Sequence, residues 1–464
     1  MVEIDLNLLS IVIFVIVLAL IVYKDRRKIK RESILLLRRT DRGKEFIIRL
    51  ANRFPRFWKV IGSIGVVTGF IVSVWAFVWL AQNLVRTFSV KEGVPGLAFL
   101  VPSLSTSASV GPGYFAIPFW YWIISIALLV VVHEGLHGVM FARDKLKIKS
   151  LGWGLLAVIP LAFVEPDEKQ LAKQKPMIQL RAFAAGSFAN FMLAGACFLI
   201  LVTAFSGLFI STGVAYQGVL KDYPAQKVNL TGTIIRIENF EINSNLDLQN
   251  ALEKAGPNKT ITVVTLDNNT EKTFTLETVP EPEPVFVPDF TTNLLIGLDQ
   301  SLPGTIEFSQ QVPKALGSLF APQQKRAWRV IQAEIKFWEY AEKNYPLLES
   351  KAERKIAELQ TELQSYPRQG FIGIVGVFNA QQIKAEFRAY QGPVEFSQGL
   401  LFFMFIINFG VGVFNLLPLK PLDGGRMWEL VFKRLSPKRY KDITAGVSYI
   451  TLLIIVLSFM GPFF

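Results

Sequence analysis

Long apolar runs separated by polar and basic stretches dominate this chain. Runs close to twenty residues match the length that an α-helix needs to cross roughly 30 Å of hydrocarbon. The pattern therefore predicts a polytopic α-helical membrane protein with about six transmembrane helices. These runs cover residues 8–23, 60–80, 118–141, 179–205, 398–417 and 443–460.

Two further apolar stretches, 90–116 and 150–165, are interrupted by glycine, proline and serine. Such breakers argue against plain transmembrane helices. Non-helical backbone is tolerated at membrane depth only where protein or a watery cavity covers it. We therefore expect hairpin or re-entrant pieces packed against the helices.

The pattern changes between the fourth and fifth apolar runs. Segments such as TGTIIRI and KTITVVTL alternate in polarity and predict strands, while LDLQNALEKAG predicts a short helix that ends at glycine. We expect an α+β soluble domain, followed by an extension whose long helical segment breaks near Pro346. The predicted parts are N-terminal helices with a basic loop (1–89), the first half of a helical core (90–208), the soluble domain (209–290), the extension (291–395) and the second half of the core (396–464).

Composition and charge agree with a multi-pass protein of the cell membrane, with the lipid bilayer as a partner. The chain of 464 residues is 51% hydrophobic and only 19% charged, with a net charge of +12. Residues 24–59 hold fourteen Lys or Arg against four acidic residues, between two apolar runs, and such blocks mark the cytoplasmic side. No aromatic or glycine pattern of a nucleic-acid module accompanies this charge, so we expect no nucleic-acid partner.

The resulting topology places both termini and the soluble domain outside. The N-x-T sequons at Asn229, Asn258 and Asn268 all fall in that domain, which agrees with the placement. The single cysteine, Cys197, lies in an apolar run and allows no intramolecular disulfide.

Candidate chemistry begins with the HExxH pattern of His133, Glu134 and His137. Helical residues four apart lie on nearly the same face, so both imidazoles can reach one metal ion. Glu134 lies one step round the helix, where it can take a proton from a water that zinc has acidified. HExxH alone also arises by chance. Here, however, the motif contains both histidines of the chain and sits at the inner end of a predicted span, where ionisable groups are costly and usually functional.

A catalytic zinc ion needs three protein ligands and one open position. The sequence offers no third histidine, so we expect a carboxylate, and Asp423 at the inner end of the fifth run is the best candidate. Without HExxH, the PLDGG segment around Asp423 would be read as an ordinary turn or a helix N-cap. Asp144, seven residues after His137, is a weaker competing ligand.

The two motifs together resemble those of the site-2 protease family of intramembrane zinc metalloproteases. Besides HExxH, the family carries N-x-x-P-x-x-x-x-D-G, which matches Asn415, Pro418, Asp423 and Gly424. The resemblance implies His133, His137 and Asp423 as zinc ligands and Glu134 as the catalytic base. It implies that Asn415 binds substrate or the developing oxyanion, although a helix-packing role would explain this residue too. The segment QLRAFAAGSFANF adds Asn190 as a polar group near the site and a second candidate for substrate binding.

The soluble domain resembles the PDZ domain that the family carries between its two motif helices. Two departures stand out. Members often have glycine just before the second histidine, where this chain has Leu136, and the extension after residue 290 has no counterpart in the family pattern.

The function expected from this resemblance is hydrolysis of peptide bonds in or near membrane-spanning segments of protein substrates, with the active site toward the cytoplasm. A zinc protease acting on soluble loops at the membrane face is one alternative. A catalytically idle scaffold that binds partners through the PDZ-like domain is another, although the intact Glu134 argues against it. A metal transporter would need more intramembrane ligands than this histidine-poor chain provides.

Overall fold

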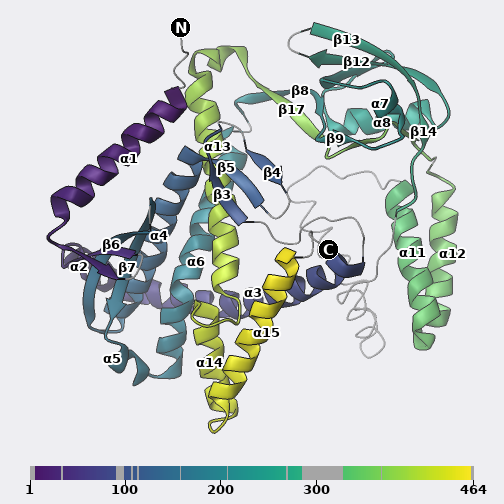
Figure 1. Ribbon diagram of the computed structural model, residues 1–464. Helices are drawn as coiled ribbons and strands as arrows, with labels where there is room; N and C mark the ends of the chain where they lie inside the picture. Colours follow the sequence, from purple (N-terminus) through teal and green to yellow (C-terminus); the bar gives the residue numbers. More distant parts are fainter. Residues whose placement is uncertain are drawn as a thin grey trace. The chain divides into compact units, whose positions relative to one another are not determined.

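The computed structural model describes most of the chain and divides it into two units (Figure 1). Unit 1 comprises Met1–Ser206 and Tyr390–Phe464, and unit 2 comprises Gly207–Ala389. The described residues are 6–32, 35–89, 99–105, 108–111, 114–156, 158–205, 207–267, 270–284, 328–366 and 368–460.

Unit 1 is built on long apolar helices. Six helices among the described residues are long and apolar enough to cross a membrane, as the sequence predicted. Helices α4, α6 and α13 pack side by side, and α3 lies against α6 (Figure 1). The six helices are α1 (Leu6–Asp25), α3 (Pro55–Ser89), α4 (Phe119–Arg143), α6 (Pro176–Ile200, continued by a π-helical turn), α13 (Gln391–Asn415) and α15 (Tyr440–Met460).

Small residues on α6 allow this close packing. Ala184, Ala185, Gly186 and Ala189 are all buried within the unit. Short side chains let neighbouring helix backbones approach closely, which is the usual basis of helix association in a membrane. Helix α6 therefore forms the centre against which the other helices are placed.

Unit 1 contains a four-stranded antiparallel sheet, of which the sequence predicted two strands. The predicted hairpin at 150–165 is confirmed as strands β6 (Ile148–Leu156) and β7 (Ile159–Pro166). The basic block, predicted as a plain loop, instead supplies strands β1 (Ile29–Glu32) and β2 (Leu35–Thr40) and the short helix α2 (Lys44–Arg53). The strand order is β1-β2-β6-β7, so β7 is an edge strand of this sheet within the described part of the chain.

The breaker-rich stretch near residue 100 forms a second, small sheet. Strand β3 (Phe99–Ser103) pairs in parallel with β5 (Tyr114–Pro118), and β4 (Ser109–Gly111) pairs antiparallel with β5. The stretch is therefore extended chain, as its prolines and glycines favour. Residues 90–98, 106–107 and 112–113 of the predicted hairpin lie outside the described residues.

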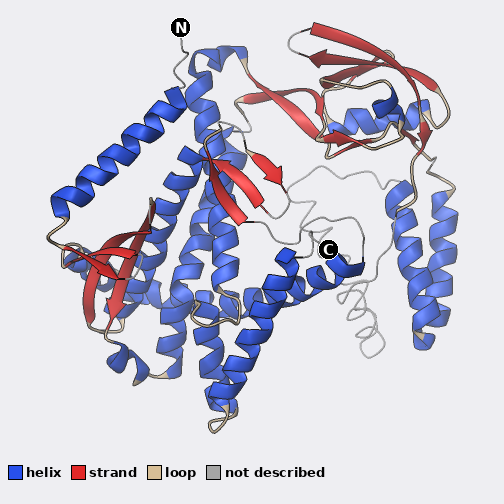
Figure 2. Cartoon of the chain, in the orientation of Figure 1, coloured by secondary structure: helices blue, strands red, loops and turns tan. Residues whose placement is uncertain are grey.

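Unit 2 contains a sheet with strand order β13-β12-β10-β8-β17, in which β11 also pairs with β10 (Figure 2). Strand β17 comes from the segment predicted as an extension, and it pairs with β8 at the start of the unit. The strands are β8 (Phe209–Ala215), β10 (Thr233–Ile237), β11 (Phe240–Glu241), β12 (Thr260–Asp267), β13 (Thr270–Glu277) and β17 (Phe378–Ile383).

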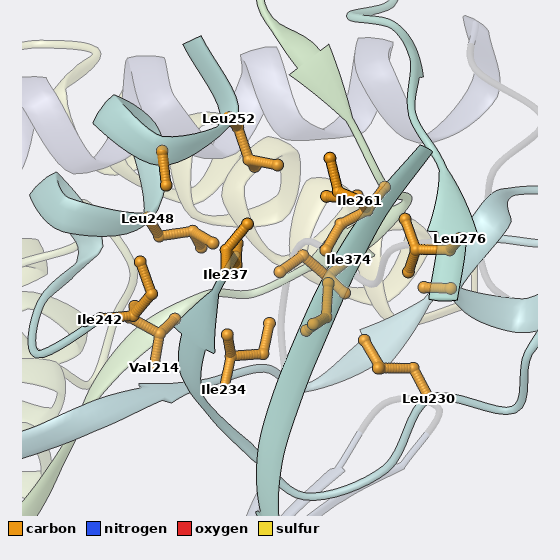
Figure 3. Packing of buried hydrophobic residues seen from close by; sticks show 14 residues of the cluster. Val214, Leu230, Ile234, Ile237, Ile242, Leu248, Leu252, Ile261, Leu276 and Ile374 are labelled. Atoms are coloured by element: carbon orange, nitrogen blue, oxygen red, sulfur yellow. The ribbon is translucent and has the colours of Figure 1, made fainter. Parts of the chain in front are cut away.

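The core of this sheet lies beneath helix α8 (Asn245–Ala255), as Figure 3 shows. Leu248 and Leu252 of α8 belong to one buried cluster with Ile237 of β10 and Ile261 of β12. The Ser244 side chain caps α8 by accepting from the Asp247 amide, and Gly256 ends it at a φ of 72°. The sequence pattern predicted this helix and its glycine stop, and the structure confirms both.

A helical hairpin follows the sheet in unit 2. Helix α11 (Trp328–Asn344) and helix α12 (Glu349–Leu363) flank a 3-10 turn at Pro346–Leu348, which confirms the expected break at Pro346. The two helices share a core of their own that includes Ile331, Trp338 and Leu359. The part of the extension from 291 to 327 lies outside the described residues.

Candidate metal centre

Three predicted ligands meet at one point in unit 1. His133 and His137 come from α4, and Asp423 is the first residue of helix α14 (Asp423–Leu435). The Asp423 Oδ2 atom lies 3.5 Å from Nε2 of each histidine, and the two Nε2 atoms are 3.3 Å apart. Together they form a potential metal-binding group of three donors, although 286 residues separate His137 from Asp423.

The chain turns sharply to bring Asp423 to this point. Helix α13 ends at Asn415, and α14 starts only eight residues later, beside it. A Cβ atom on Gly424 would lie 2.0 Å from the Leu416 carbonyl oxygen, and one on Gly425 would lie 2.5 Å from the Leu419 carbonyl carbon. The two glycines therefore permit a close backbone approach that no larger residue allows.

The spacing of the three donors suits zinc. Zinc binds imidazole nitrogen and carboxylate oxygen at about 2.0–2.2 Å, so the ligands of a tetrahedral ion lie roughly 3.3–3.5 Å apart. The observed separations of 3.3–3.5 Å match this edge length. The donor set leaves one tetrahedral position open, as a catalytic site requires.

Gly186 lets α6 pass close to the two histidine rings. A Cβ atom at this position would lie 2.3 Å from His137 Nε2 and 2.4 Å from His133 Nε2. Both distances are far below an ordinary van der Waals contact, so any larger residue would clash with the rings. The missing side chain thus allows the two nitrogens to keep the spacing that, together with Asp423, fits a zinc ion.

Hydrogen bonds from α6 orient the two rings. His137 Nδ1 lies 2.7 Å from the Ala182 carbonyl oxygen, which can only accept, so Nδ1 carries the proton and Nε2 is free to bind metal. His133 Nδ1 lies 3.2 Å from the side-chain amide of Asn190, whose Oδ1 atom is buried without a partner. Turning the amide over would let Oδ1 accept from His133 Nδ1 and would satisfy both groups.

Asn190 was predicted to contact substrate, and that role stays a prediction. It is fully buried, it contacts His133, and it is not among the residues that line the cavity beside the site. This position places it next to one of the possible metal ligands. The sequence analysis missed Ser187, also fully buried, whose hydroxyl donates to Asp423 Oδ2 over 3.4 Å. The sequence feature that could have indicated Ser187 is its position between Gly186 and Asn190 on one stretch of helix.

Glu134 and Asn415 both line a cavity of about 970 Å³ that reaches the three donors. Glu134 Oε2 accepts a hydrogen bond from the Val164 amide of β7 over 3.0 Å, which fixes the carboxylate beside the edge strand. The competing ligand Asp144 lies elsewhere, where it pairs with Arg143, and it does not belong to the donor group.

Comparison with known proteins agrees with this geometry. The profile of peptidase family M50 matches residues 121–458, which include both predicted motifs. Two similar proteins are "Putative zinc metalloprotease SAS1196" and "Putative zinc metalloprotease MW1145", from Staphylococcus aureus strains MSSA476 and MW2. Each is 24% identical over 303 residues, which cover 64% of this chain and 62% of the relative. The matched region thus spans less than two thirds of these relatives.

Proposed function

Since the chain belongs to peptidase family M50, we propose that it is an intramembrane zinc metalloprotease that hydrolyses peptide bonds in or near transmembrane segments of substrate proteins. The observation that carries this proposal is the meeting of His133, His137 and Asp423 at tetrahedral spacing beside Glu134. The family match confirms the resemblance found in the sequence, and the names of the relatives specify zinc.

Different residues would bind the metal ion and transfer the proton. His133, His137 and Asp423 would hold the zinc ion, which when bound supplies Lewis acidity that activates water and polarises a carbonyl group. Glu134 would accept the proton of the attacking water and pass it to the departing amide nitrogen. The hydrogen bond from the Val164 amide keeps one carboxylate oxygen in place and leaves the other for proton transfer.

A substrate must be locally unwound, because carbonyls locked in helical hydrogen bonds are poorly open to attack. Strand β7 offers an extended partner beside Glu134, and addition of a strand to a sheet edge is a common mode of peptide recognition. Alternate residues of a strand direct their amides to the same edge. The Val164 amide faces away from β6, so the Ala162 amide, two residues earlier, faces away from β6 as well. Pro160 and Pro166 lie at the corresponding positions on either side and have no amide hydrogen to donate.

Because the Val164 amide already donates to Glu134, the Ala162 amide is the one left between the two prolines, and strand addition is limited to a short stretch around it. The prolines would prevent longer pairing and would keep the scissile bond in register with Glu134. Asn415 lines the same cavity and is the candidate to bind the substrate carbonyl or the developing oxyanion. The proposed orientation keeps the active site toward the cytoplasm and the PDZ-like domain outside, where it would bind or screen substrates.

The proposal is tested by comparing wild-type protein with Glu134→Gln in proteoliposomes that contain candidate membrane-spanning substrates. Glutamine keeps the size of the side chain but cannot act as a base. We expect the variant to bind zinc like the wild type and to lose cleavage by roughly 10²–10⁴-fold.

Mass spectrometry of the fragments distinguishes the alternatives. Cleavage sites within apolar spans support the proposal, and sites confined to soluble loops support action at the membrane face. Equal fragment patterns from wild type and Glu134→Gln, or no zinc in the wild type, would favour the idle scaffold.

A further inference from the structure

The junction between α2 and α3 exposes an unusual mixture of aromatic and basic side chains. Phe46, Phe54 and Phe57 are 63%, 50% and 54% exposed. On the opposite face of α2, Ala51 is fully inaccessible and Ile47 and Leu50 are partly buried. The helix is thus anchored on one side and leaves large apolar groups uncovered on another. We call the exposed residues Phe46 to Lys59 the elbow surface.

The apolar part of the elbow surface continues into a stripe along α3. Phe57, Val60, Ile64, Val67 and Ile71 are all exposed and recur at helical spacing of three or four residues. Helix α3 is one of the candidate membrane spans, so this stripe is the face that hydrocarbon covers. Phe57 lies at its start and therefore near the level of the lipid headgroups.

Cations surround the start of this stripe. Arg49, Arg53 and Arg56 are all exposed, and none makes an ion pair within the described part of the chain. Arg49 and Arg53 lie three and seven residues after Phe46, on the same side of α2. The surface therefore combines apolar insertion groups with uncompensated positive charge.

A second group of cations lies where α4 ends and α6 begins. Arg143 donates to the Pro55 carbonyl at the elbow over 3.3 Å, and Arg181 donates to Ser63 Oγ of α3 over 3.1 Å. With Lys59, these two cations act on a single acid, Asp144. Three positive charges thus face one negative charge, so positive charge dominates this group as well.

We propose that the elbow surface is a docking site for the headgroups of anionic phospholipids, with α2 lying in the membrane interface. Amphipathic helices with basic and aromatic side chains bind anionic bilayers in this way. The cytoplasmic leaflet, where the basic block is expected, carries such lipids and attracts cations near its surface. Continuity with the lipid-facing stripe of α3 favours a bilayer over a protein partner as the occupant.

The elbow surface lies on a helix that packs directly against α4, the helix that carries His133 and His137. Ala51 shares a buried cluster with Leu136 and Met140 of α4, and Ile47 packs against Gly138. The Trp58 indole donates to the Leu50 carbonyl over 2.9 Å and fixes the bend between α2 and α3. Docking of lipid on α2 would therefore stabilise the back of the HExxH helix.

The test measures lipid binding and needs no peptidase activity. Native mass spectrometry of the full chain, purified from bilayers of phosphatidylglycerol and phosphatidylcholine, gives the affinity for each lipid. We expect the triple variant Arg49→Gln, Arg53→Gln, Arg56→Gln to bind phosphatidylglycerol roughly a hundredfold more weakly, at about fivefold per lost cation. A matched control, Lys227→Gln, Lys254→Gln, Lys259→Gln, removes three exposed cations from unit 2 and should bind like the wild type.

A second measurement locates α2 directly. In a Cys197→Ala background, a nitroxide on Phe46→Cys should be more accessible to oxygen than to a water-soluble nickel reagent in phosphatidylglycerol nanodiscs. If the same label becomes more accessible to the nickel reagent in phosphatidylcholine nanodiscs than in phosphatidylglycerol nanodiscs, this change would support the role of headgroup charge. The proposal is overturned if the triple variant and its control bind phosphatidylglycerol equally. A label that stays in water in both lipids would also overturn it and would point to a protein partner.

Discussion

Replacing Gly186 with alanine should abolish zinc binding although every ligand remains in place. The added Cβ would lie 2.3 Å from His137 Nε2 and 2.4 Å from His133 Nε2. Because an ordinary van der Waals contact needs at least 3.4 Å, each ring would have to retreat by about 1 Å. A methyl group pressed against both Nε2 atoms would therefore displace the rings from the positions in which they converge with Asp423.

Moving the two histidine rings away from the added methyl group would weaken the hydrogen bonds that hold them. His137 is held by the Ala182 carbonyl over 2.7 Å and His133 by Asn190, and both partners lie on the same helix as Gly186. Any movement away from the methyl group lengthens these hydrogen bonds. Overpacking of this kind costs about 1–3 kcal/mol in a buried site. Loss of an orienting partner alone typically weakens metal binding about 10–100-fold, and displacement of both rings should exceed that.

The assay is zinc stoichiometry by elemental analysis, followed by competition with a chelator of known affinity. Gly195→Ala is a matched control, because it lies on the same helix and its Cβ would meet nothing within 4 Å. Both substitutions gain about 1 kcal/mol in helix propensity, so their difference isolates the clash. We expect Gly195→Ala to bind one zinc ion like the wild type. Wild-type zinc affinity in Gly186→Ala would refute the assignment of these two rings as zinc ligands.

Three further outcomes follow from single contacts. Asn190→Leu should weaken zinc binding about 10–100-fold in chelator competition while the secondary structure measured by circular dichroism stays unchanged, since it removes only the partner of His133. Trp58→Phe should lower the unfolding free energy by about 1 kcal/mol in a denaturant titration, because it removes the indole hydrogen bond to Leu50. Ile234→Ala should destabilise unit 2 by about 2–5 kcal/mol, seen as faster amide exchange in that unit but not in α4 or α6, since Ile234 is fully buried.

The sequence alone determined the features that depend on local pattern. Six apolar runs predicted six helices, because a span must satisfy its backbone hydrogen bonds within a single segment and must be apolar along most of its length. The HExxH motif predicted two possible ligands on one helical face, because residues four apart in a helix lie on nearly the same side. Asp423 could be predicted as the third possible ligand because the chain has no third histidine and this carboxylate lies at the inner end of the fifth apolar run.

Tertiary structure decided the features that depend on distant neighbours. The basic block shows no clear strand pattern, and its strand β2 is established by pairing with β6, more than 100 residues later. Strand β17 likewise joins its sheet only through β8 at the other end of unit 2. Strand pairing is a non-local interaction, so a charged or short segment can become a strand when an edge with free amides is available.

The contacts of Asn190, Ser187 and Gly186 also required the tertiary structure. All three lie on one stretch of α6, and its composition shows only that the helix packs closely. These contacts depend on which side chains of α4 and α14 the residues face, over sequence separations of 57 residues for Asn190 and 236 for Ser187. A helix face presents the same small and polar residues whether it meets a lipid, another helix or a metal site. Only the packing of α6 against α4 and α14 makes that face part of the metal centre.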